Sequence, residues 1–392
     1  MASETATSYR LGVLGAAKIA KKNCRAASHP STSCSVVAVA SRSKEKGSDF
    51  VNEIFTSTGK TAPAVVSGEN AYLDLLADST GSLNLDAVYI PLPTKLHEKY
   101  VLEALSSGHH VLLEKPVAVS ADSYRRMLNA ASANGKFLQD GTMFVHHPRT
   151  KEFVNAIPNP NRLSFNFTFN GDDDFFKNDV RIKKDGDFMG CIGDLGWYCV
   201  RMGLLVFTRM DAKALKGIVT DVQVFRFQLS EDGVPIDADC MVYFTDNRVL
   251  SFHCSFLHPL NQTAHMTGSG QIYNVTITDP ILPYEGEKIT FAFAKQDLIQ
   301  FDEICTKEKK VVECDNSLVQ EVCMWGHFAK WSKKIQEERD SPKDPENEVW
   351  WGGDSNEVKA ANAMATFSLH TQIVLDGLMD SIRLKGAKIS LL

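Results

Sequence analysis

Short apolar runs alternate with helix-like stretches through the first 143 residues, and no other feature restricts the fold as strongly. The apolar runs lie at residues 11–14, 35–40, 85–90, 111–113 and 136–139. Apolar runs separated by helices are typical of a parallel sheet that is covered on both faces. We therefore predict a doubly wound parallel α/β sheet over residues 1–143, with a polar loop between Thr58 and Ala71.

The pattern changes beyond residue 143. Residues 163–169 alternate apolar and polar side chains with period two, as a half-buried antiparallel strand does. Strand-like runs follow at about 217–229, 238–245, 249–257, 264–267, 273–278 and 290–294. Helix-like stretches lie at about 190–206, 319–337 and 357–378. Residues 337–353 have the polar composition of a surface loop. The sequence thus predicts a second, α+β domain over residues 144–392, built on a largely antiparallel open β-sheet. The last helix either belongs to this domain or packs back on the first one.

Composition excludes several classes of function. The net charge of −6 and the isoelectric point near 6.0 do not favour binding to nucleic acid or to an anionic membrane. The sequence contains no apolar run long enough to span a bilayer. Its nine cysteines are scattered without a CxxC pair, which favours reduced thiols in the cytoplasm over a disulfide framework. We predict a cytoplasmic protein without a metal site.

The first apolar run ends in a glycine turn. Residues 15–20, Gly-Ala-Ala-Lys-Ile-Ala, place Gly15, Ala17 and Ala20 at the three glycine positions of the dinucleotide-binding pattern GxGxxG. Only the first glycine is kept, and a methyl group at Ala17 would crowd a bound phosphate. From these residues alone, a plain strand–helix turn explains the sequence equally well. The candidate cofactor-binding residues here are Gly15, Ala16, Ala17, Lys18 and Ile19.

The second run ends in Ser41-Arg42-Ser43, with no acidic residue in the place where NAD enzymes usually bind the ribose hydroxyls. An arginine between two hydroxyls suits a 2′-phosphate, because its planar guanidinium can donate two hydrogen bonds to phosphate oxygens. Ser41 and Arg42 are therefore candidates for binding NADP(H). The alternative is an ordinary solvated arginine in a loop.

Two further strand ends carry candidate residues. Residues 91–94, Pro-Leu-Pro-Thr, stop the run 85–90, and Thr94 is a natural helix N-cap. His97 follows, and a single histidine in such a place is more often structural than catalytic. The run 111–113 ends in Glu114-Lys115-Pro116. Ligands bind at the carboxyl ends of strands in such sheets, so this charged pair is either a capped strand end or a working site.

The second domain contains one stretch with candidate chemistry, Gly190–Arg201. Asp194 and Tyr198 are four residues apart and share one face of a helix. A carboxylate beside a phenol can form a proton-transfer pair. The alternative is an N-cap aspartate with a packed tyrosine, which the spacing alone favours.

Together these motifs resemble the Gfo/Idh/MocA oxidoreductases, which include glucose-fructose oxidoreductase and inositol dehydrogenase. The resemblance rests on residues 15–20, on Pro91–Thr94 with His97, on Glu114-Lys115-Pro116 and on Gly193–Tyr198, in that order along nearly the whole chain. Residues 140–150 and 176–181 resemble the eukaryotic branch of the family. That branch holds dimeric dihydrodiol dehydrogenase, NADP-dependent D-xylose dehydrogenase and plant oxidoreductases.

The resemblance implies a Rossmann domain and roles for individual residues. Lys115 would be the catalytic lysine, followed by a proline peptide that is often cis, and Tyr198 would donate or accept a proton while Asp194 orients it or the substrate. The implied cofactor pocket includes Pro91, Leu92, Thr94, His97 and Glu114, and the weaker substrate candidates are Asn178, Arg181 and Trp197. The resemblance also implies a homodimer formed through the C-terminal sheet.

The predicted function is that of an NADP(H)-dependent oxidoreductase. Hydride would move to or from a hydroxyl-bearing carbon of a sugar, such as the aldose C1 of D-xylose, or of a cyclic diol such as a trans-dihydrodiol. A free tyrosine has a pKa near 10, and a lysine ammonium close to it could lower that pKa by about 1–3 units. Alternatively, Lys115 holds the hydroxyl oxygen and Tyr198 relays the proton. Two other functions stay open: a non-catalytic NAD(P)-binding sensor of the same fold, and a reductase of another small cyclic substrate.

Overall fold

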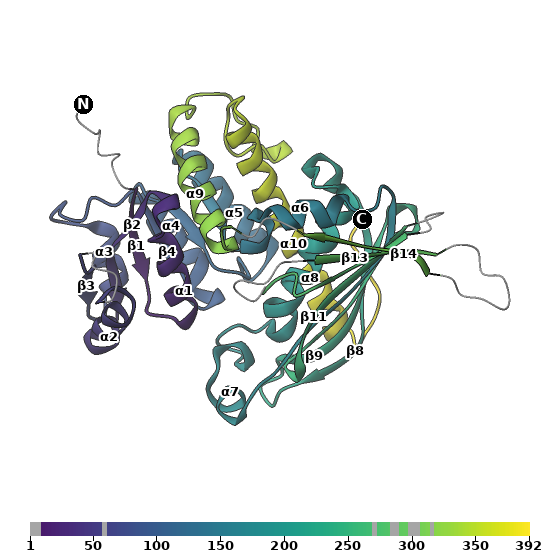
Figure 1. Ribbon diagram of the computed structural model, residues 1–392. Helices are drawn as coiled ribbons and strands as arrows, with labels where there is room; N and C mark the ends of the chain where they lie inside the picture. The colour runs from purple at the N-terminus through teal and green to yellow at the C-terminus, as the bar shows by residue number, and fades with distance from the viewer. Residues whose placement is uncertain (1–8, 57–60, 269–272, 283–289, 297–305, 314–316) are drawn as a thin grey trace. The chain divides into compact units, whose positions relative to one another are not determined.

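The computed structural model describes residues 9–56, 61–268, 273–282, 290–296, 306–313 and 317–392 (Figure 1). Contacts divide the chain into two compact units. Unit 1 contains residues Met1–His146 and Gln320–Ala365, and unit 2 contains His147–Val319 and Thr366–Leu392. The chain therefore passes from one unit to the other three times after residue 143, the third time inside the last long helix. The predicted domains, 1–143 and 144–392, stay a prediction.

Unit 1 is built on a parallel sheet of six strands, counted over its described residues, in the order β3-β2-β1-β4-β5-β6. The strands are β1 (Tyr9–Leu14), β2 (Cys34–Ser41), β3 (Ala64–Ser67), β4 (Ala87–Ile90), β5 (His110–Leu113) and β6 (Leu138–Asp140). The helices between them are α1 (Lys18–Ala27), α2 (Lys44–Phe55), α3 (Ala71–Ala77), α4 (His97–Ser106) and α5 (Ala121–Ala133). The central strands β4 and β5 are buried along their whole length, as the apolar runs predicted.

One strand of this sheet departs from the prediction. Residues 64–67 form β3, which pairs with β2 in parallel, in the segment predicted to be a polar loop. β3 is the edge strand and none of its residues is fully buried. An edge strand of four residues needs no long apolar run, and this explains why the pattern did not indicate it.

A late segment of the chain completes unit 1. Helix α9 (Gln320–Glu337) packs against α1, and Trp325 and Phe328 on α9 are buried. The segment 337–353, predicted to be a polar surface loop, ends in two buried tryptophans, Trp350 and Trp351. The indole nitrogen of Trp351 donates to the carbonyl of Lys136 at 2.8 Å. These two side chains attach the otherwise polar segment to unit 1.

Unit 2 is built on a sheet of nine strands, counted over the described residues, in the order β14-β13-β12-β11-β7-β10-β9-β8-β15. Its strands are β7 (Pro160–Asn170), β8 (Val219–Leu229), β9 (Pro235–Phe244), β10 (Val249–Ser255), β11 (Leu257–Gly268), β12 (Tyr273–Thr278), β13 (Thr290–Gln296), β14 (Thr306–Glu313) and β15 (Ile389–Ser390). Its helices are α6 (Pro148–Asn155), α7 (Asp173–Asn178), α8 (Trp197–Thr208) and the second part of α10 (Asn356–Arg383). Where the structure describes these strands, they pair antiparallel, except β10 with β7.

Helix α8 covers one face of this sheet. The side chains of Leu163, Phe165 and Phe167 on β7 are buried, whereas the residues between them point to the other face. Two glycines allow a close approach of the helical segment: a Cβ on Gly196 would lie 3.3 Å from Phe252, and one on Gly203 would lie 2.7 Å from Leu250. The predicted alternation of β7 therefore places one face in a core and leaves the other open.

The predicted fold class is confirmed: a parallel Rossmann-type sheet comes first, and a separate, mostly antiparallel sheet follows. Among the described residues, no helix is both long enough and apolar enough to cross a membrane.

A pair of glycines in unit 2 provides a stability test. Gly190 has a φ of +53°, and a Cβ there would lie 2.0 Å from the carbonyl oxygen of Pro235, whereas Gly217, with a φ of +70°, has no neighbouring atom within 4 Å. Gly217→Ala should lower the free energy of unfolding by about 1–2 kcal/mol, the cost of a left-handed backbone. Gly190→Ala should lower it by about 1–3 kcal/mol more, because the methyl group also overlaps backbone. Urea denaturation of both variants measures the difference, and equal losses would contradict the close approach.

Candidate active site

The glycine turn after β1 has the geometry of a cofactor turn. Gly15 has a φ of +115°, and a Cβ there would lie 3.1 Å from the Leu92 side chain. Ala17 is the N-cap of α1 with extended backbone angles, φ −76° and ψ 155°, so alanine fits there without strain. The first turn of α1 has neither a side-chain cap nor an acidic residue, and Lys18 and Ile19 are exposed. Such an N-terminus can bind an anion.

At the end of β2, the two serines that flank Arg42 lie in different environments. Ser41 is buried, and Arg42 is exposed at the carboxyl end of the strand. Ser43 is the N-cap of α2, and its Oγ accepts from the Lys46 N–H at 3.3 Å. The Ser43 hydroxyl thus caps a helix, and Arg42 is the exposed residue of this trio; its contact with a cofactor stays a prediction.

The segment after β4 is held by His97. The imidazole is buried, with Nε2 2.7 Å from the Leu92 carbonyl oxygen and Nδ1 3.1 Å from the Val117 carbonyl oxygen. His97 therefore joins the loop after β4 to the segment after β5, which is the structural role. Thr94 opens a short 3₁₀ turn, Thr94–Leu96, and neither this turn nor α4 has a side-chain cap, so the predicted N-cap is wrong.

Glu114 belongs to a buried polar network. Its Oε1 accepts from the Tyr89 hydroxyl at 2.5 Å and from Asn23 Nδ2 at 3.3 Å, and its Oε2 accepts from the backbone N–H of Lys115 at 3.2 Å. Asn23 also donates to the Tyr89 hydroxyl at 2.9 Å and accepts from the indole of Trp325 at 3.1 Å. The carboxylate is thus tied to β4, α1 and α9.

Burial controls the electrostatics of this network. It raises the pKa of Glu114 above its ordinary value of 4.5, and the Tyr89 hydroxyl and the Lys115 ammonium offset only part of this effect. Burial, followed by the neighbouring Glu114, also raises the pKa of Tyr89 well above its ordinary value. The carboxyl group is therefore held in place by donors while its charge is poorly solvated.

Lys115 lies next to this anchor, half-buried, and its peptide bond to Pro116 is cis, as the resemblance implied. The parallel sheet brings Lys115 to the same edge as the other strand ends, because all carboxyl ends of parallel strands point one way. This edge collects Gly15, Ser41, Arg42, Pro91, Leu92, Thr94, His97, Glu114 and Lys115. The strand order reverses between β1 and β4, which is where such sheets bind ligands.

In unit 2, Arg181 joins two carboxylates. Its Nε and one Nη bond both oxygens of Asp179, at 2.9 and 3.0 Å, and its other Nη bonds Asp194 at 3.1 Å. The guanidinium also lies over the rings of Phe169 and Phe175, 5.4 and 4.8 Å from their centres. Burial by itself raises the pKa of Asp179, but the hydrogen bonds from Arg181 outweigh it and hold the pKa below its ordinary range.

Contrary to the prediction, Asp194 and Tyr198 do not lie in one regular α-helix. Residues Ile192–Gly196 form a π-helical turn, and α8 begins at Trp197. The two side chains therefore belong to successive kinds of turn rather than to one face of a regular α-helix. π-Turns are rare and occur frequently at functional sites. Tyr198 is buried, with its ring 5.7 Å from that of Phe167.

The two remaining substrate candidates have local roles. Trp197 is fully buried, and the Arg201 guanidinium lies 5.3 Å from its ring centre. Asn178, at the exposed end of α7, donates to Asp174 at 2.7 Å. A contact of either residue with substrate stays a prediction.

Sequence reasoning missed the partners of the predicted residues. Asn23 and Tyr89 hold Glu114, Trp325 holds Asn23, and Asp179 holds Arg181. Two of these carry a signal in hindsight: Tyr89 is the one hydroxyl-bearing residue within the apolar strand Ala87–Ile90, and Asp179 precedes Arg181 by two residues. Trp325 carries none, because its contact joins residues 302 positions apart.

The raised pKa of Glu114 predicts a pH dependence of stability. An acid whose pKa is higher in the folded state stabilises the fold below its unfolded pKa, and this stabilisation is lost as the pH rises through the folded value. The free energy of unfolding should therefore fall as the pH rises from about 4.5 toward that raised pKa. Glu114→Gln should remove this fall, because the amide does not ionise.

Urea denaturation over a pH series measures this dependence. Glu98→Gln is the control with the opposite sign, because the Arg126 side chain lowers the pKa of Glu98, so its contribution is lost as the pH falls. Parallel curves for the wild type and Glu114→Gln would contradict the burial of a poorly solvated carboxyl group.

Comparison with known proteins places the first part of the chain. A family model described as an oxidoreductase family with an NAD-binding Rossmann fold, Gfo/Idh/MocA, matches residues 9–142. The segment contains the complete strand edge from Gly15 to Lys115.

Curated relatives cover about half of the chain. A dTDP-3,4-didehydro-2,6-dideoxy-α-D-glucose 3-reductase of Streptomyces violaceoruber is 34% identical over 209 residues, which are 52% of this chain and 56% of the relative. A D-xylose 1-dehydrogenase (NADP(+)) of Haloferax volcanii is 32% identical over 205 residues, 51% of this chain and 58% of the relative. The chain thus spans little more than half the length of the curated relatives it matches.

Solved structures share the fold over almost the whole chain. A 3-ketoreductase from Actinomadura kijaniata, in complex with NADP and TDP-benzene, has a TM-score of 0.72 at 21% identity and covers 95% of this chain and 98% of its own. An aldose-aldose oxidoreductase from Caulobacter crescentus has a TM-score of 0.70 at 15% identity, with 98% and 100% covered. Residues 9–142 are thus similar to the Rossmann domain of the Gfo/Idh/MocA oxidoreductase family, and the likeness beyond them is one of fold.

Proposed function

We propose that the chain is an NADP(H)-dependent oxidoreductase that moves hydride to or from a hydroxyl-bearing carbon of a sugar. One observation carries the proposal: Lys115 lies beside an anchored carboxylate at the carboxyl edge of a sheet whose segment matches an NAD-binding family. The curated relatives support the sugar class, since their names describe a deoxysugar 3-reductase and a D-xylose 1-dehydrogenase. A cyclic diol such as a trans-dihydrodiol is the second substrate class to be tested.

The turn after β1 fits a dinucleotide. Because Gly15 has no Cβ, the space between its backbone and the Leu92 side chain stays open. The first turn of α1 contains no acidic side chain. Backbone N–H groups at such a turn would hold the pyrophosphate. When bound, the nicotinamide ring supplies or takes the hydride. The protein's part is then to position the substrate and to move its hydroxyl proton.

Arg42 favours NADP(H) over NAD(H) in this proposal. The residue is exposed at the end of β2, where the 2′ position of a bound adenosine ribose would lie, and an arginine there binds phosphate with two parallel hydrogen bonds. The names of a relative and of a structural neighbour support the same cofactor, because one is NADP(+)-dependent and the other was solved with NADP.

Lys115 and Tyr198 are the two residues proposed to handle the hydroxyl proton. In oxidation, a base must accept that proton as hydride leaves the carbon, and in reduction the proton returns. Lys115 carries a positive charge that stabilises an alkoxide or a phenolate, and Tyr198 carries the transferable proton. Asp194, held by Arg181, is proposed to orient the substrate or Tyr198.

A substrate panel tests the function directly. Initial rates of NADPH oxidation and NADP(+) reduction are measured against keto-sugars, aldoses including D-xylose, inositols and trans-dihydrodiols. Turnover of one sugar well above the background rate supports the proposal. Binding of NADPH without turnover of any compound would favour the non-catalytic sensor instead.

We further propose that the protein works as a cytoplasmic homodimer formed through the open face of the sheet in unit 2. That face carries short polar side chains such as Ser164 and Ser251, whose hydroxyls lie 3.2 Å apart on β7 and β10. Light scattering of the purified chain measures the mass, and a monomer at micromolar concentration would contradict this part of the proposal.

The role of Lys115 predicts a loss of turnover in Lys115→Met. The substitution removes the ammonium at similar side-chain length, so kcat should fall by about 10²–10⁴-fold, the usual contribution of a general acid–base group. The dissociation constant for NADPH, measured by fluorescence titration, should change little. Lys151→Met on α6 is the matched control, since that lysine is exposed on a helix without predicted site residues. Wild-type turnover in Lys115→Met would overturn the assignment.

The role of Arg42 predicts a change of cofactor preference in Arg42→Asp. A carboxylate repels the 2′-phosphate and can accept hydrogen bonds from ribose hydroxyls instead. The ratio of kcat/KM for NADP(H) to that for NAD(H) should fall at least about tenfold, which corresponds to ~1.4 kcal/mol. Arg125→Asp, an equal charge reversal at an exposed position on α5, should leave the ratio unchanged. If both variants keep the wild-type ratio, Arg42 does not bind the phosphate.

A further inference from the structure

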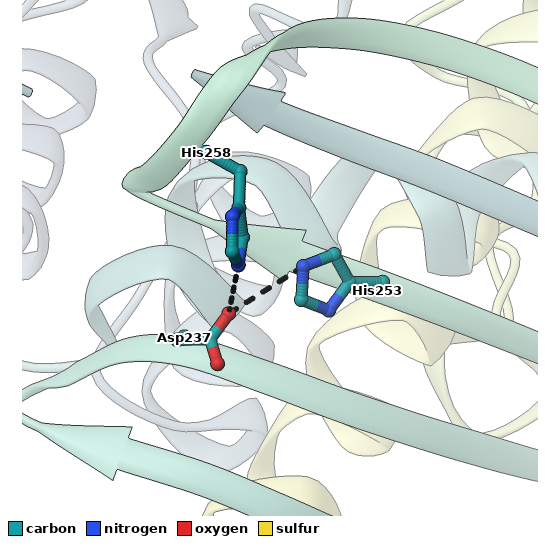
Figure 2. A group of neighbouring side chains, drawn as sticks. All are labelled: Asp237, His253 and His258. Atoms are coloured by element: carbon teal, nitrogen blue, oxygen red, sulfur yellow. Dashed lines mark ion pairs between the residues drawn. The ribbon is translucent and has the colours of Figure 1, made fainter. Parts of the chain in front are cut away.

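Two histidines and an aspartate meet on the open face of the sheet in unit 2. Asp237 lies on β9, His253 on β10 and His258 near the start of β11, and one ligand atom from each lies within 4.8 Å of the others (Figure 2). In Figure 2 the two imidazole rings approach the same carboxylate from two different strands. None of these residues belongs to the proposed oxidoreductase site, but they lie on the sheet face proposed to form the homodimer, so their exposure is that of the single chain.

The local strand geometry places His258 over the sheet. β11 pairs Leu257 with Asn170 and then Asn261 with Thr168, so a register shift separates these two pairs. The residues between them leave the ladder, and the side chain of His258 is 52% exposed. This bulge brings an imidazole from β11 to a carboxylate on β9, which is three strands away in the sheet order.

The carboxylate lacks a donor on the side that faces the histidines. Asp237 is buried, with a side-chain exposure of 2%, and its Oδ1 has no hydrogen-bond partner. The Nε2 atoms of His253 and His258 lie 3.4 and 3.7 Å from this oxygen. N–H···O hydrogen bonds are usually 2.7–3.2 Å long, so both separations exceed the normal range.

Surrounding residues fix the orientation of this group. His253 Nδ1 lies 2.8 Å from Asp239 Oδ1, so this carboxylate holds the ring on one side while Nε2 faces Asp237 on the other. Arg226 bonds the outer oxygen of Asp237 at 2.8 Å and also bonds Asp239. With Nδ1 held by Asp239, Nε2 is the nitrogen of His253 that can bind a cation beside the unpartnered Oδ1 of Asp237.

We propose that Asp237, His253 and His258 bind a divalent transition-metal ion of the zinc class. Zinc accepts imidazole nitrogen and carboxylate oxygen at about 2.0–2.2 Å in a tetrahedron, which separates neighbouring ligand atoms by about 3.3 Å. The two N···O separations are close to that value. The carboxylate of Asp239 on the far nitrogen of His253 is the usual outer support of a metal-binding histidine.

The fourth coordination position is open to an exchangeable ligand. A hollow of about 540 Å³ lies beside the histidines and is lined by Asn166, Thr168, His253, His258 and Pro259–Asn261. Water or a small anion can enter there. The bound ion would also tie the bulge of β11 to β9 and β10, so binding should stabilise the fold by mass action.

The sequence predicted no metal site, and the spacing explains why. The three ligands lie 16 and 5 residues apart, on three different strands, without the short repeat spacing of metal-binding motifs. Only the pairing of β9 with β10 and the bulge in β11 bring them together.

The test uses the full chain after treatment with a chelator and dialysis. Zn²⁺ binding is measured by calorimetry, and Co²⁺ is added as a spectroscopic probe. We expect one equivalent to bind per chain, a rise in Tm on addition of Zn²⁺, and the intense ligand-field bands of tetrahedral Co²⁺. His258→Ala and Asp237→Asn should weaken binding at least about tenfold, and Asp239→Asn about 10–100-fold as an outer-sphere change.

His265→Ala is the matched control. His265 lies on the same strand, β11, and its Nδ1 lies 2.9 Å from the Thr276 hydroxyl, outside the three-residue group. This variant should bind Zn²⁺ as the wild type does. Because the side chain of His258 is exposed, His258→Ala should keep the fold, and a circular dichroism spectrum is the check.

Two results would overturn the proposal. The first is a wild-type chain that binds neither Zn²⁺ nor Co²⁺ at micromolar concentrations. The second is Zn²⁺ binding that His258→Ala and Asp237→Asn leave unchanged. Neither result bears on the substrate panel, so the two proposals fail independently.

Discussion

The parallel unit depends on the hydrogen bonds that hold the buried carboxylate of Glu114. A carboxylate in such a place is unfavourable unless donors surround it, and Tyr89, Asn23 and the backbone N–H of Lys115 supply them. Because these donors come from β4, α1 and the residue that follows, the network fixes the end of β5. The position of Lys115 at the carboxyl edge is therefore set by packing before any ligand binds.

Much of the fold could be predicted because it follows local periodicity. The strands β1, β2, β4 and β5 are apolar runs, and β7 alternates apolar and polar side chains. A few residues of each strand are therefore enough to predict whether it is buried on one face or on both. β3 escaped prediction because an edge strand needs little apolar surface. The tryptophans at 350 and 351 were assigned to a surface loop because composition averages over a segment, whereas two side chains are enough to bury one end of it.

Motifs indicated the candidate site residues, which stay a prediction, but they did not indicate the residues that hold them. Lys115, Arg42 and Tyr198 follow from motifs, since a strand end or a spacing identifies them. Glu114 was assigned to the cofactor pocket, yet its carboxylate is engaged by Tyr89, which is 25 residues away along the chain. The π-turn at Ile192–Gly196 was likewise invisible, because a helix of either kind satisfies the same apolar pattern.

The two units order their candidate site residues in different ways. In unit 1 the charge next to Lys115 is buried and held by neutral donors, whereas in unit 2 Asp194 is held by an arginine that Asp179 binds through both of its carboxylate oxygens. A planar guanidinium with five donors can hold two carboxylates and still stack on Phe169 and Phe175, which a lysine ammonium cannot do. Each unit thus orders its candidate residues through its own contacts. Preorganised charges of this kind need no rearrangement at the moment of reaction, and this is how electrostatic groups contribute most to catalysis.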